Sequence, residues 1–284
     1  MQWNQMLSNG IPRKTEYELL ASQPLYEELL QYSRQFEVRC RDGGIFSKLY
    51  GLKWVEDPFL QWSRSWEYVY VLQRLQHWWK SHSGTSDIVD AGSGFTFFPF
   101  YLQQLQPISK IRCFDADITV GKAITRAGRA INTGPDFYLE NLEKLKQETE
   151  SIDVVYSISV IEHTQHPRQV IDEIHRILKP GGLFLCTFDI SFEEQSTMHV
   201  RHVEKLIARV SELFDPEPGW NDIGVAGASS DPDAVTTRWI SEIAPEKLPW
   251  KIPTLIWLYD ALRGRLRSSL YRPMTFYCGA YYKK

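Results

Sequence analysis

The sequence predicts an α/β fold in which a Rossmann-like, mostly parallel seven-stranded sheet carries helices on both faces. Three observations lead to this prediction. Short β-branched runs alternate with amphipathic segments between residues 88 and 188. The first run enters a glycine turn, Asp90-Ala91-Gly92-Ser93-Gly94, that precedes a helix. The second run ends in Asp115, 21 residues after Gly94. We expect a helical N-terminal cap over 1–84, this core over 85–190, and a C-terminal insertion with a closing strand over 191–284.

Composition excludes several classes of protein. The formal net charge is −3, and the chain has no long run of like charge. A nucleic-acid-binding protein usually has a basic face, so this class is not expected. The four cysteines form no C-x-x-C pair, which argues against a zinc site or a disulfide scaffold and fits a reducing compartment. Neither a signal peptide nor a membrane-spanning segment is apparent. We therefore expect a cytoplasmic monomer or homodimer with no membrane span and no nucleic-acid partner.

Helix-start signals predict three helices before the core, at the capping-box pair Thr15 and Glu18, at Pro24, and at Asp57-Pro58. The second helix ends at Gly43-Gly44 and the third at about Ser83. The cap is rich in aromatic residues, which either pack against the sheet or line a substrate pocket. The pocket interpretation concerns Phe46, Tyr50, Trp54, Trp62 and Trp66.

The core elements follow in regular alternation. We expect strands at 88–91, 111–114, 137–139, 152–158 and 183–188, and helices at 96–106, 119–132 and 167–178. Asp117 is the better N-cap candidate for the second of these helices. Strands and helices of these lengths imply parallel strands with right-handed crossovers.

The pattern changes after Asp189. An amphipathic helix is expected around 203–214, long loops over 215–250, and a closing strand over 274–282. A further helix begins at Pro253, with apolar residues on one side: Leu255, Leu258, Tyr259, Leu262 and Leu266. It either belongs to the folded body or lies in a membrane interface.

The glycine turn and Asp115 form a candidate nucleoside site. A carboxylate at the end of the second strand can accept hydrogen bonds from both hydroxyls of a ribose, or it can serve a turn. An NAD-binding domain would show the same pair. However, Asp90 directly precedes the turn, and Thr96 replaces the third glycine. An acid there would repel a pyrophosphate and suits a ligand with an amino group or a cation.

Residues 88–189 resemble the class I S-adenosylmethionine-dependent methyltransferases. Asp90-Ala91-Gly92-Ser93-Gly94 is similar to the family's first motif, and Phe114-Asp115-Ala116-Asp117 to its ribose motif. Residues 151–163 resemble the fourth-strand motif, and Arg176-Ile177-Leu178-Lys179-Pro180-Gly181-Gly182 resembles the turn before the fifth strand. The last piece, at this distance from the fourth-strand motif, is the most specific part of the resemblance.

The resemblance implies S-adenosylmethionine as cofactor and S-adenosylhomocysteine as product. It assigns Asp90 and Gly92 to the methionine end of the cofactor and Asp115 to the ribose, and Gly94 would let the cofactor pass close to the backbone. Ala91 and Ala116 are further residues expected to bind the cofactor. Asn141 and Leu142 would contact the adenine, with Glu140 as the alternative to Asn141. Ser157 and Ile158 would lie beneath the cofactor.

The implied reaction is an in-line displacement, and an alcohol or ammonium acceptor needs a base to remove its proton. His163 is the candidate base, with Glu162 orienting it or acting itself; the pair is alternatively structural. His163 and His166 are too few ligands for a metal, so none is expected. His199, one helical turn from His202, either faces the substrate pocket or is solvated.

These expectations combine into a methyltransferase of small molecules in natural-product or sugar tailoring, and hence in secondary metabolism. The favoured acceptor atom is oxygen, and nitrogen is the alternative. Aromatic residues in the cap favour a ring-bearing or cationic acceptor. Two alternatives belong to other classes. One is a catalytically silent protein of the same fold that binds a partner. The other is an NAD(P)-dependent oxidoreductase, which would need room for a pyrophosphate beside Asp90.

Overall fold

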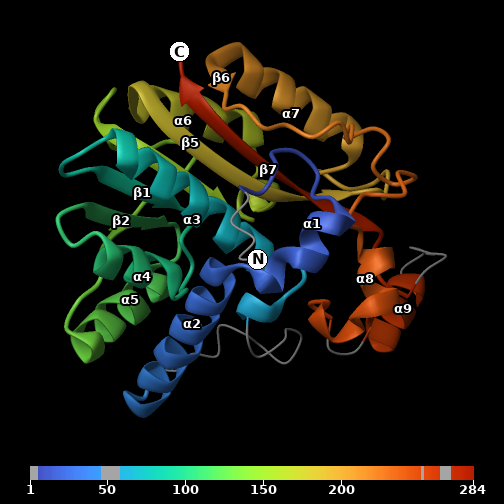
Figure 1. The fold of residues 1–284 in the computed structure, drawn as a ribbon, viewed down its shortest axis with the longest axis horizontal. Coiled ribbons are helices and arrows are strands. Elements are labelled where there is room, and N and C mark those ends of the chain that lie inside the picture. The colour runs from blue at the N-terminus through green and yellow to red at the C-terminus, as the bar shows by residue number, and fades with distance from the viewer. Residues whose placement is uncertain (1–5, 46–57, 251–252, 263–269) are drawn as a thin grey trace.

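The structure is a computed structural model that describes residues 6–45, 58–250, 253–262 and 270–284. Its centre is a seven-stranded sheet in the order β3-β2-β1-β4-β5-β7-β6 (Figure 1). The strands are β1 Asp87–Ala91, β2 Lys110–Asp115, β3 Asp136–Leu139, β4 Ile152–Ile158, β5 Leu178–Ser191, β6 Phe214–Pro216 and β7 Met274–Lys283. Only β7 runs antiparallel to its neighbours β5 and β6. The predicted mostly parallel seven-stranded sheet is confirmed.

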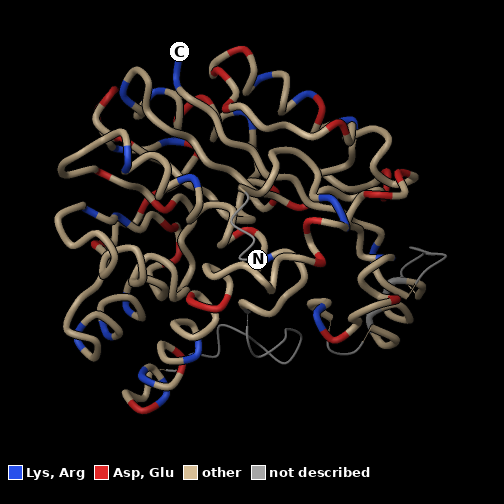
Figure 2. The backbone as a smooth tube through the Cα atoms, in the orientation of Figure 1, with Lys and Arg blue, Asp and Glu red and all other residues tan. Residues whose placement is uncertain are grey.

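The nine helices of the described chain pack on this sheet. They are α1 Lys14–Leu19, α2 Pro24–Asp42, α3 Arg64–Ser81, α4 Phe98–Leu105, α5 Ile118–Ile131, α6 Pro167–Ile177, α7 Val200–Leu213, α8 Thr237–Ile243 and α9 Pro253–Leu262. No described helix is long and apolar enough to cross a bilayer. Charged residues of both signs are interspersed along the chain (Figure 2).

Each face of the sheet has its own apolar core. Ile88 and Val154 face the core formed with α3, α4 and α5, whereas Val89 and Val155 face the core formed with α6 and α7. Successive strand residues point to opposite faces, so central strands buried on both sides need the continuous apolar runs that this sequence supplies. Helices therefore cover both faces of the sheet, as predicted.

Strand register brings the carboxyl ends of the parallel strands to one edge. Asp90 pairs with Cys113 of β2 and with Tyr156 of β4, and Asp115 pairs with Leu139 of β3. The residues that follow β1, β2, β3 and β4 therefore meet at this edge, where open α/β sheets bind their ligands.

Two predicted helix starts in the cap were wrong. Helix α1 begins at Lys14 after Arg13, and no side chain caps it, so Thr15 and Glu18 form no capping box. Helix α3 begins at Arg64, preceded by a separate 3₁₀ turn, Pro58–Leu60. The turn buries Phe59, whose ring lies 5.3 Å from that of Tyr26. Tertiary packing thus interrupts the helix that local signals favour. Asp57 lies outside the described residues.

The expected loop over 215–250 was also wrong in part. Strand β6 pairs with β7 at the sheet edge. Helix α8 begins at Thr237 because the side chain of Thr236 accepts a hydrogen bond from the Trp239 amide. Helix α9 begins at Pro253 as predicted, and its apolar residues Leu255, Leu258, Tyr259 and Leu262 are exposed. Leu266 lies outside the described residues.

Candidate active site

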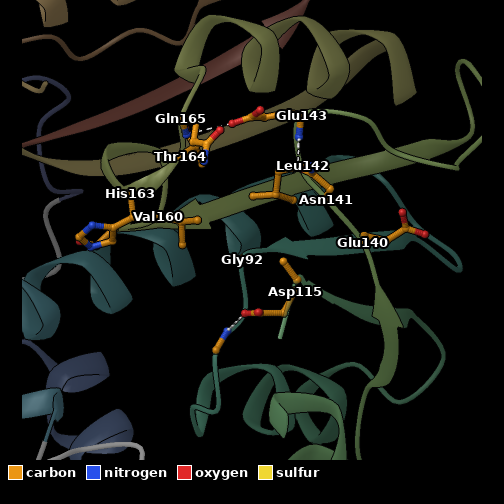
Figure 3. Close-up of a pocket in the computed structure, with 13 residues that line it drawn as sticks. Gly92, Asp115, Glu140, Asn141, Leu142, Glu143, Val160, His163, Thr164 and Gln165 are labelled. Atoms are coloured by element: carbon orange, nitrogen blue, oxygen red, sulfur yellow. Dashed lines mark hydrogen bonds between the residues drawn. The ribbon is translucent and has the colours of Figure 1, made fainter. Parts of the chain in front are cut away.

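A pocket of about 560 Å³ opens at the carboxyl edge of β1, β2, β3 and β4 (Figure 3). It lies within the range of about 300–1,000 Å³ that is typical of small-molecule sites. Its walls come from the turns and loops that follow these four strands. The lining residues are Gly92, Gly94, Asp115, Ala116, Glu140, Asn141, Leu142, Glu143, Ser159, Val160, His163, Thr164 and Gln165.

The glycine turn forms one wall of the pocket. Gly92 has a φ of +80°, and a Cβ there would lie 2.2 Å from a methyl carbon of Val160. Its amide donates a hydrogen bond to the Phe114 carbonyl at 2.8 Å, which fixes the turn against the end of β2. Gly94 has a φ of +52° and faces open space. Glycine is needed at 92 for both conformation and close approach, and the backbone at 94 is left open to a ligand.

Asp115 is held rigidly at the end of β2. Its carboxylate oxygens accept hydrogen bonds from the Gly94 amide at 2.9 Å and from the Asp117 amide at 2.8 Å. A carboxylate has about four acceptor sites, so two remain for a ligand in the pocket. Asp117, as predicted, is the N-cap of α5, since its side chain accepts from the Thr119 amide at 2.8 Å. Asp115 is therefore not engaged as a helix cap.

The loop after β3 forms the opposite wall. Glu140 is buried, and its amide donates to the Asp115 carbonyl at 3.0 Å. Glu143 ties this loop to the one after β4, because its carboxylate accepts from the amides of Gln165 and His166, both at 2.9 Å. Both Glu140 and Asn141 line the pocket, so both of the predicted alternatives lie at this wall.

Some predicted cofactor residues lie behind the pocket wall rather than on it. Asp90, Ala91, Ser157 and Ile158 are strand residues that do not line the pocket. The Ser157 hydroxyl donates to the Ala91 carbonyl at 3.0 Å, which joins β4 to β1. Asp90 is buried, and burial, assisted by the negative charge of Asp115, raises its pKa to about 8. Asp90 is thus protonated near neutrality in the ligand-free protein.

Several lining residues escaped sequence reasoning: Glu143, Ser159, Val160, Thr164 and Gln165. The one feature of the sequence that could have predicted them is their place directly after strands whose carboxyl ends meet at the pocket. Ser159 has a φ of +49°, an uncommon backbone conformation for a residue other than glycine. Its hydroxyl donates to the carboxylate of Glu67 at 2.7 Å, which anchors it to α3.

His163 stands exposed at the rim of the pocket, at the end of a 3₁₀ turn. Partial desolvation of the ring and the positive charge of Arg64 lower its pKa. The imidazole is consequently neutral near pH 7 and able to accept a proton.

Glu162 turns away from His163 toward the end of β5. One carboxylate oxygen accepts from the Asp189 amide at 3.2 Å, and the other is buried without a partner among the described residues. Burial and the nearby Asp189 raise the pKa of Glu162, and burial together with Glu67 raises that of Asp189 to about 7. Neither carboxylate oxygen of Glu162 is hydrogen-bonded to His163, so the structure does not show Glu162 orienting the His163 ring.

Helix α3 contributes charged groups beside the pocket. Glu67 is fully buried and pairs with Arg64 at 2.6 Å. Glu162 and Asp189 also feel the charge of this arginine, which favours their ionised forms. Three carboxyl groups thus surround one guanidinium next to Ser159, at the border between the cap and the sheet.

The predicted substrate residues are dispersed. Phe46, Tyr50 and Trp54 lie outside the described residues. Trp62 and Trp66 are buried in the core, with ring centres 5.0 and 6.4 Å from that of Phe276, and do not line the pocket. His199 is the N-cap of α7, where its Nδ1 accepts from the Arg201 amide. No group of three or more His, Cys, Asp or Glu within the described ranges is arranged to hold a metal.

Comparison with known proteins identifies the domain that carries the pocket. Residues 89–186, which hold most of β1, all of β2 to β4, the first part of β5 and the glycine turn, match a methyltransferase domain. Residues 89–186 therefore carry a domain of the class I S-adenosylmethionine-dependent methyltransferase type. S-adenosylmethionine is the cofactor of this family. The open backbone at Gly94 and the free acceptor sites of Asp115 fit such a ligand.

The similarity extends to individual proteins over part of their length. A thiol S-methyltransferase, TMT1B of Rattus norvegicus, is 29% identical over 59% of this chain and 62% of its own. A probable S-adenosylmethionine-dependent methyltransferase of Mycolicibacterium smegmatis is 32% identical over 44% of each chain. The chain thus spans less than two thirds of these relatives.

Among solved structures, one described as the [4+2]-cyclase SpnF shares the fold. It has a TM-score of 0.52 at 15% identity, and the similarity covers 81% of this chain and 86% of that one. Because one fold hosts different reactions, this likeness supports the architecture and leaves the acceptor to be argued from the site.

Proposed function

We propose that this chain is an S-adenosylmethionine-dependent methyltransferase that methylates a small molecule. The observation that carries the proposal is the carboxylate of Asp115, which two backbone amides hold beside the open glycine turn while its remaining acceptor sites face the pocket. When bound, the cofactor supplies a methyl group activated on a positively charged sulfur.

The chain's own residues would divide the binding task. Asp115 accepts the ribose hydroxyls, and Gly94 allows close backbone approach. Glu140, Asn141 and Leu142 surround the adenine. Asp90, behind the turn, loses its proton when a cationic ligand is near, because an opposite charge favours the ionised carboxylate.

His163 would remove the proton from the acceptor. It lies at the pocket rim, and its lowered pKa leaves it unprotonated near neutrality. The Glu162–Asp189 pair is the alternative proton acceptor, since both carboxyl groups have raised pKa values at the same sheet edge. A base with a pKa near the working pH is the most effective one.

The acceptor atom is proposed to be oxygen, with a thiol as the second candidate. A ubiquinone biosynthesis O-methyltransferase of Dictyostelium discoideum is 38% identical over 55 residues, and the rat relative is a thiol S-methyltransferase. A thiol has an ordinary pKa of about 8.5, so it depends less on a base than a phenol or sugar hydroxyl does. The proposed substrate is a natural product or a sugar. The proposed enzyme acts in the cytoplasm as a monomer or a homodimer.

The test is methyl transfer from labelled cofactor to a panel of phenols, sugars, thiols and amines. The proposal expects label in an oxygen or sulfur acceptor. At a cofactor concentration near the wild-type Kd, transfer should fall in Asp115→Ala but persist in Asp117→Ala. Cofactor binding without transfer to any acceptor would favour the silent binding protein. Binding of NAD(P) in place of S-adenosylmethionine would favour the oxidoreductase.

A further inference from the structure

Helix α9 presents an apolar face to solvent. The exposed fractions are 59% for Leu255, 49% for Leu258, 52% for Tyr259 and 80% for Leu262. These positions follow the i, i+3, i+4, i+7 spacing that places side chains on one side of a helix. A soluble protein usually turns such a stripe toward its core, and a contiguous exposed apolar face marks an interaction surface.

The neighbouring helix also carries an exposed apolar residue. Helix α8 lies next to α9, away from the centre of the sheet (Figure 1), and its last residue, Ile243, is 54% exposed. The rings of Trp250 and Tyr271, on either side of the α9 segment, are 6.0 Å apart and bring its two ends together. Charged residues are sparse along α9 itself (Figure 2). Residues 250 and 271, which flank the segment that contains α9, therefore lie close together, and the apolar side of α9 faces solvent.

The charge of this stretch identifies the occupant. Residues 251–269 contain four basic residues, Lys251, Arg263, Arg265 and Arg267, and one acidic residue, Asp260, so their formal net charge is +3 (four less one). The structure does not describe these four basic residues, which enter only as the charge carried by the stretch. A second copy of the chain would bring like charge to the same face. A surface of opposite charge is favoured instead.

We propose that the α9 face docks on a lipid bilayer that contains anionic headgroups. Apolar side chains on one side of a short helix and basic residues in the same stretch are the two features that bind a helix in the plane of a membrane interface. The exposed Tyr259 ring suits the headgroup level, where amphipathic aromatic rings collect. The helix rests on the surface and does not span it.

This placement has a consequence for the pocket. Strand β7 begins at Met274, which pairs with Ser191 at the carboxyl end of β5. The α9 segment precedes β7 and thus joins the sheet at the same edge at which the pocket opens. A membrane bound by α9 would lie on the side of the molecule from which a ligand enters.

Co-sedimentation of the full chain with vesicles tests the proposal. We expect binding to phosphatidylcholine vesicles that contain phosphatidylglycerol and weaker binding to phosphatidylcholine alone. High salt, which screens the basic charge, should lower binding to the anionic vesicles to the level seen with phosphatidylcholine alone. The variant Leu255→Glu/Leu258→Glu should bind the anionic vesicles at least roughly tenfold more weakly, since it places charge in the apolar layer. Its fold is checked by circular dichroism.

The matched control is Val38→Glu/Ile108→Glu, which changes two apolar residues, 52% and 60% exposed, on α2 and on the loop after α4. It should bind vesicles like the wild type. The proposal is overturned if the wild type remains in the supernatant with anionic vesicles, or if the α9 variant binds as well as the control. It is equally overturned if sedimentation velocity shows a dimer that the α9 variant dissociates and no vesicle binding occurs.

Discussion

Asp90 combines burial with a ligand-dependent charge. Burial raises its pKa in the folded chain to about 8, whereas an unfolded aspartate titrates near 3.9. The folded protein therefore binds an extra proton between these values. This contribution to stability is complete below about pH 4 and is lost as the pH rises to about 8.

The resulting prediction concerns the pH dependence of unfolding. In ligand-free wild type, Asp90 lowers the unfolding free energy by up to about 1.4 kcal/mol for each pH unit across this window. Asp90→Asn removes that slope, so urea unfolding at pH 5 and pH 8 should show a smaller difference in the variant. Parallel pH profiles for both proteins would mean that the Asp90 carboxyl is not desolvated as the structure indicates.

His163 gives the second prediction at this scale. If it is the base, His163→Ala should lower kcat about 10²-fold or more for a hydroxyl acceptor and leave cofactor affinity unchanged. The wild-type rate should fall with acid below the ordinary imidazole pKa of about 6.5, because the pKa of His163 is lowered and its protonated form cannot accept a proton. If His163→Ala lowers kcat only mildly and its rate falls at the same acid pH as that of the wild type, the titration of Glu162 and Asp189 would account for this fall instead.

At the scale of elements, the turn between β1 and α4 determines the shape of the pocket. Gly92 combines a positive φ with a Cβ position that lies 2.2 Å from Val160, on the loop after β4. Any side chain there would push these two walls apart. Gly181 offers a matched comparison, since it also has a positive φ, +73°, but would place a Cβ in open space.

We therefore predict that Gly92→Ala destabilises the protein more than Gly181→Ala does. Backbone strain alone costs about 1–2 kcal/mol and applies to both variants. The contact with Val160 adds to it only at Gly92, and cofactor affinity should fall only in that variant. Denaturant unfolding and cofactor titration of both variants check this. Equal stability losses and equal affinities would show that Val160 moves aside without consequence.

Elements that depend on local pattern were predictable. The strands from β1 to β5, the glycine turn, the N-cap at Asp117 and the carboxylate at Asp115 could be predicted because residue type and spacing along the chain determine them. Spacing predicted Gly92, Gly94 and Asp115 at one edge, the family resemblance added Ala116, Asn141 and Leu142, and all six line the pocket.

Features that depend on distant contacts were not predictable. Ser159 and Glu67 are 92 residues apart, yet their hydrogen bond joins the cap to the pocket. The Glu143 carboxylate contacts backbone amides rather than side chains, which leaves no residue-type signal in the partner segment. Trp62 and Trp66 were assigned to a possible substrate pocket but are buried in the core. Aromatic composition alone does not distinguish a residue that packs in the core from one that lines a substrate pocket.

At the scale of the whole molecule, one sheet edge collects the functional features. The glycine turn, Asp115, the loop after β3, His163 and the carboxyl groups beside α3 all follow from parallel strands whose carboxyl ends coincide. The cap contributes Arg64 and Glu67 from α3, and the C-terminal insertion brings α8 and α9 to the same edge. The sheet positions the proposed chemistry, and the added helices define its surroundings.

The central claim is that this edge binds S-adenosylmethionine through Asp115, and equilibrium titration with S-adenosylhomocysteine tests it most directly. The wild type should bind one molecule with micromolar affinity. Asp115→Ala should weaken binding by about 1–3 kcal/mol, the cost of charged hydrogen bonds, whereas Asp117→Ala should lose the N-cap of α5 and bind normally. Absence of binding by the wild type, or equal binding by both variants, would contradict the account.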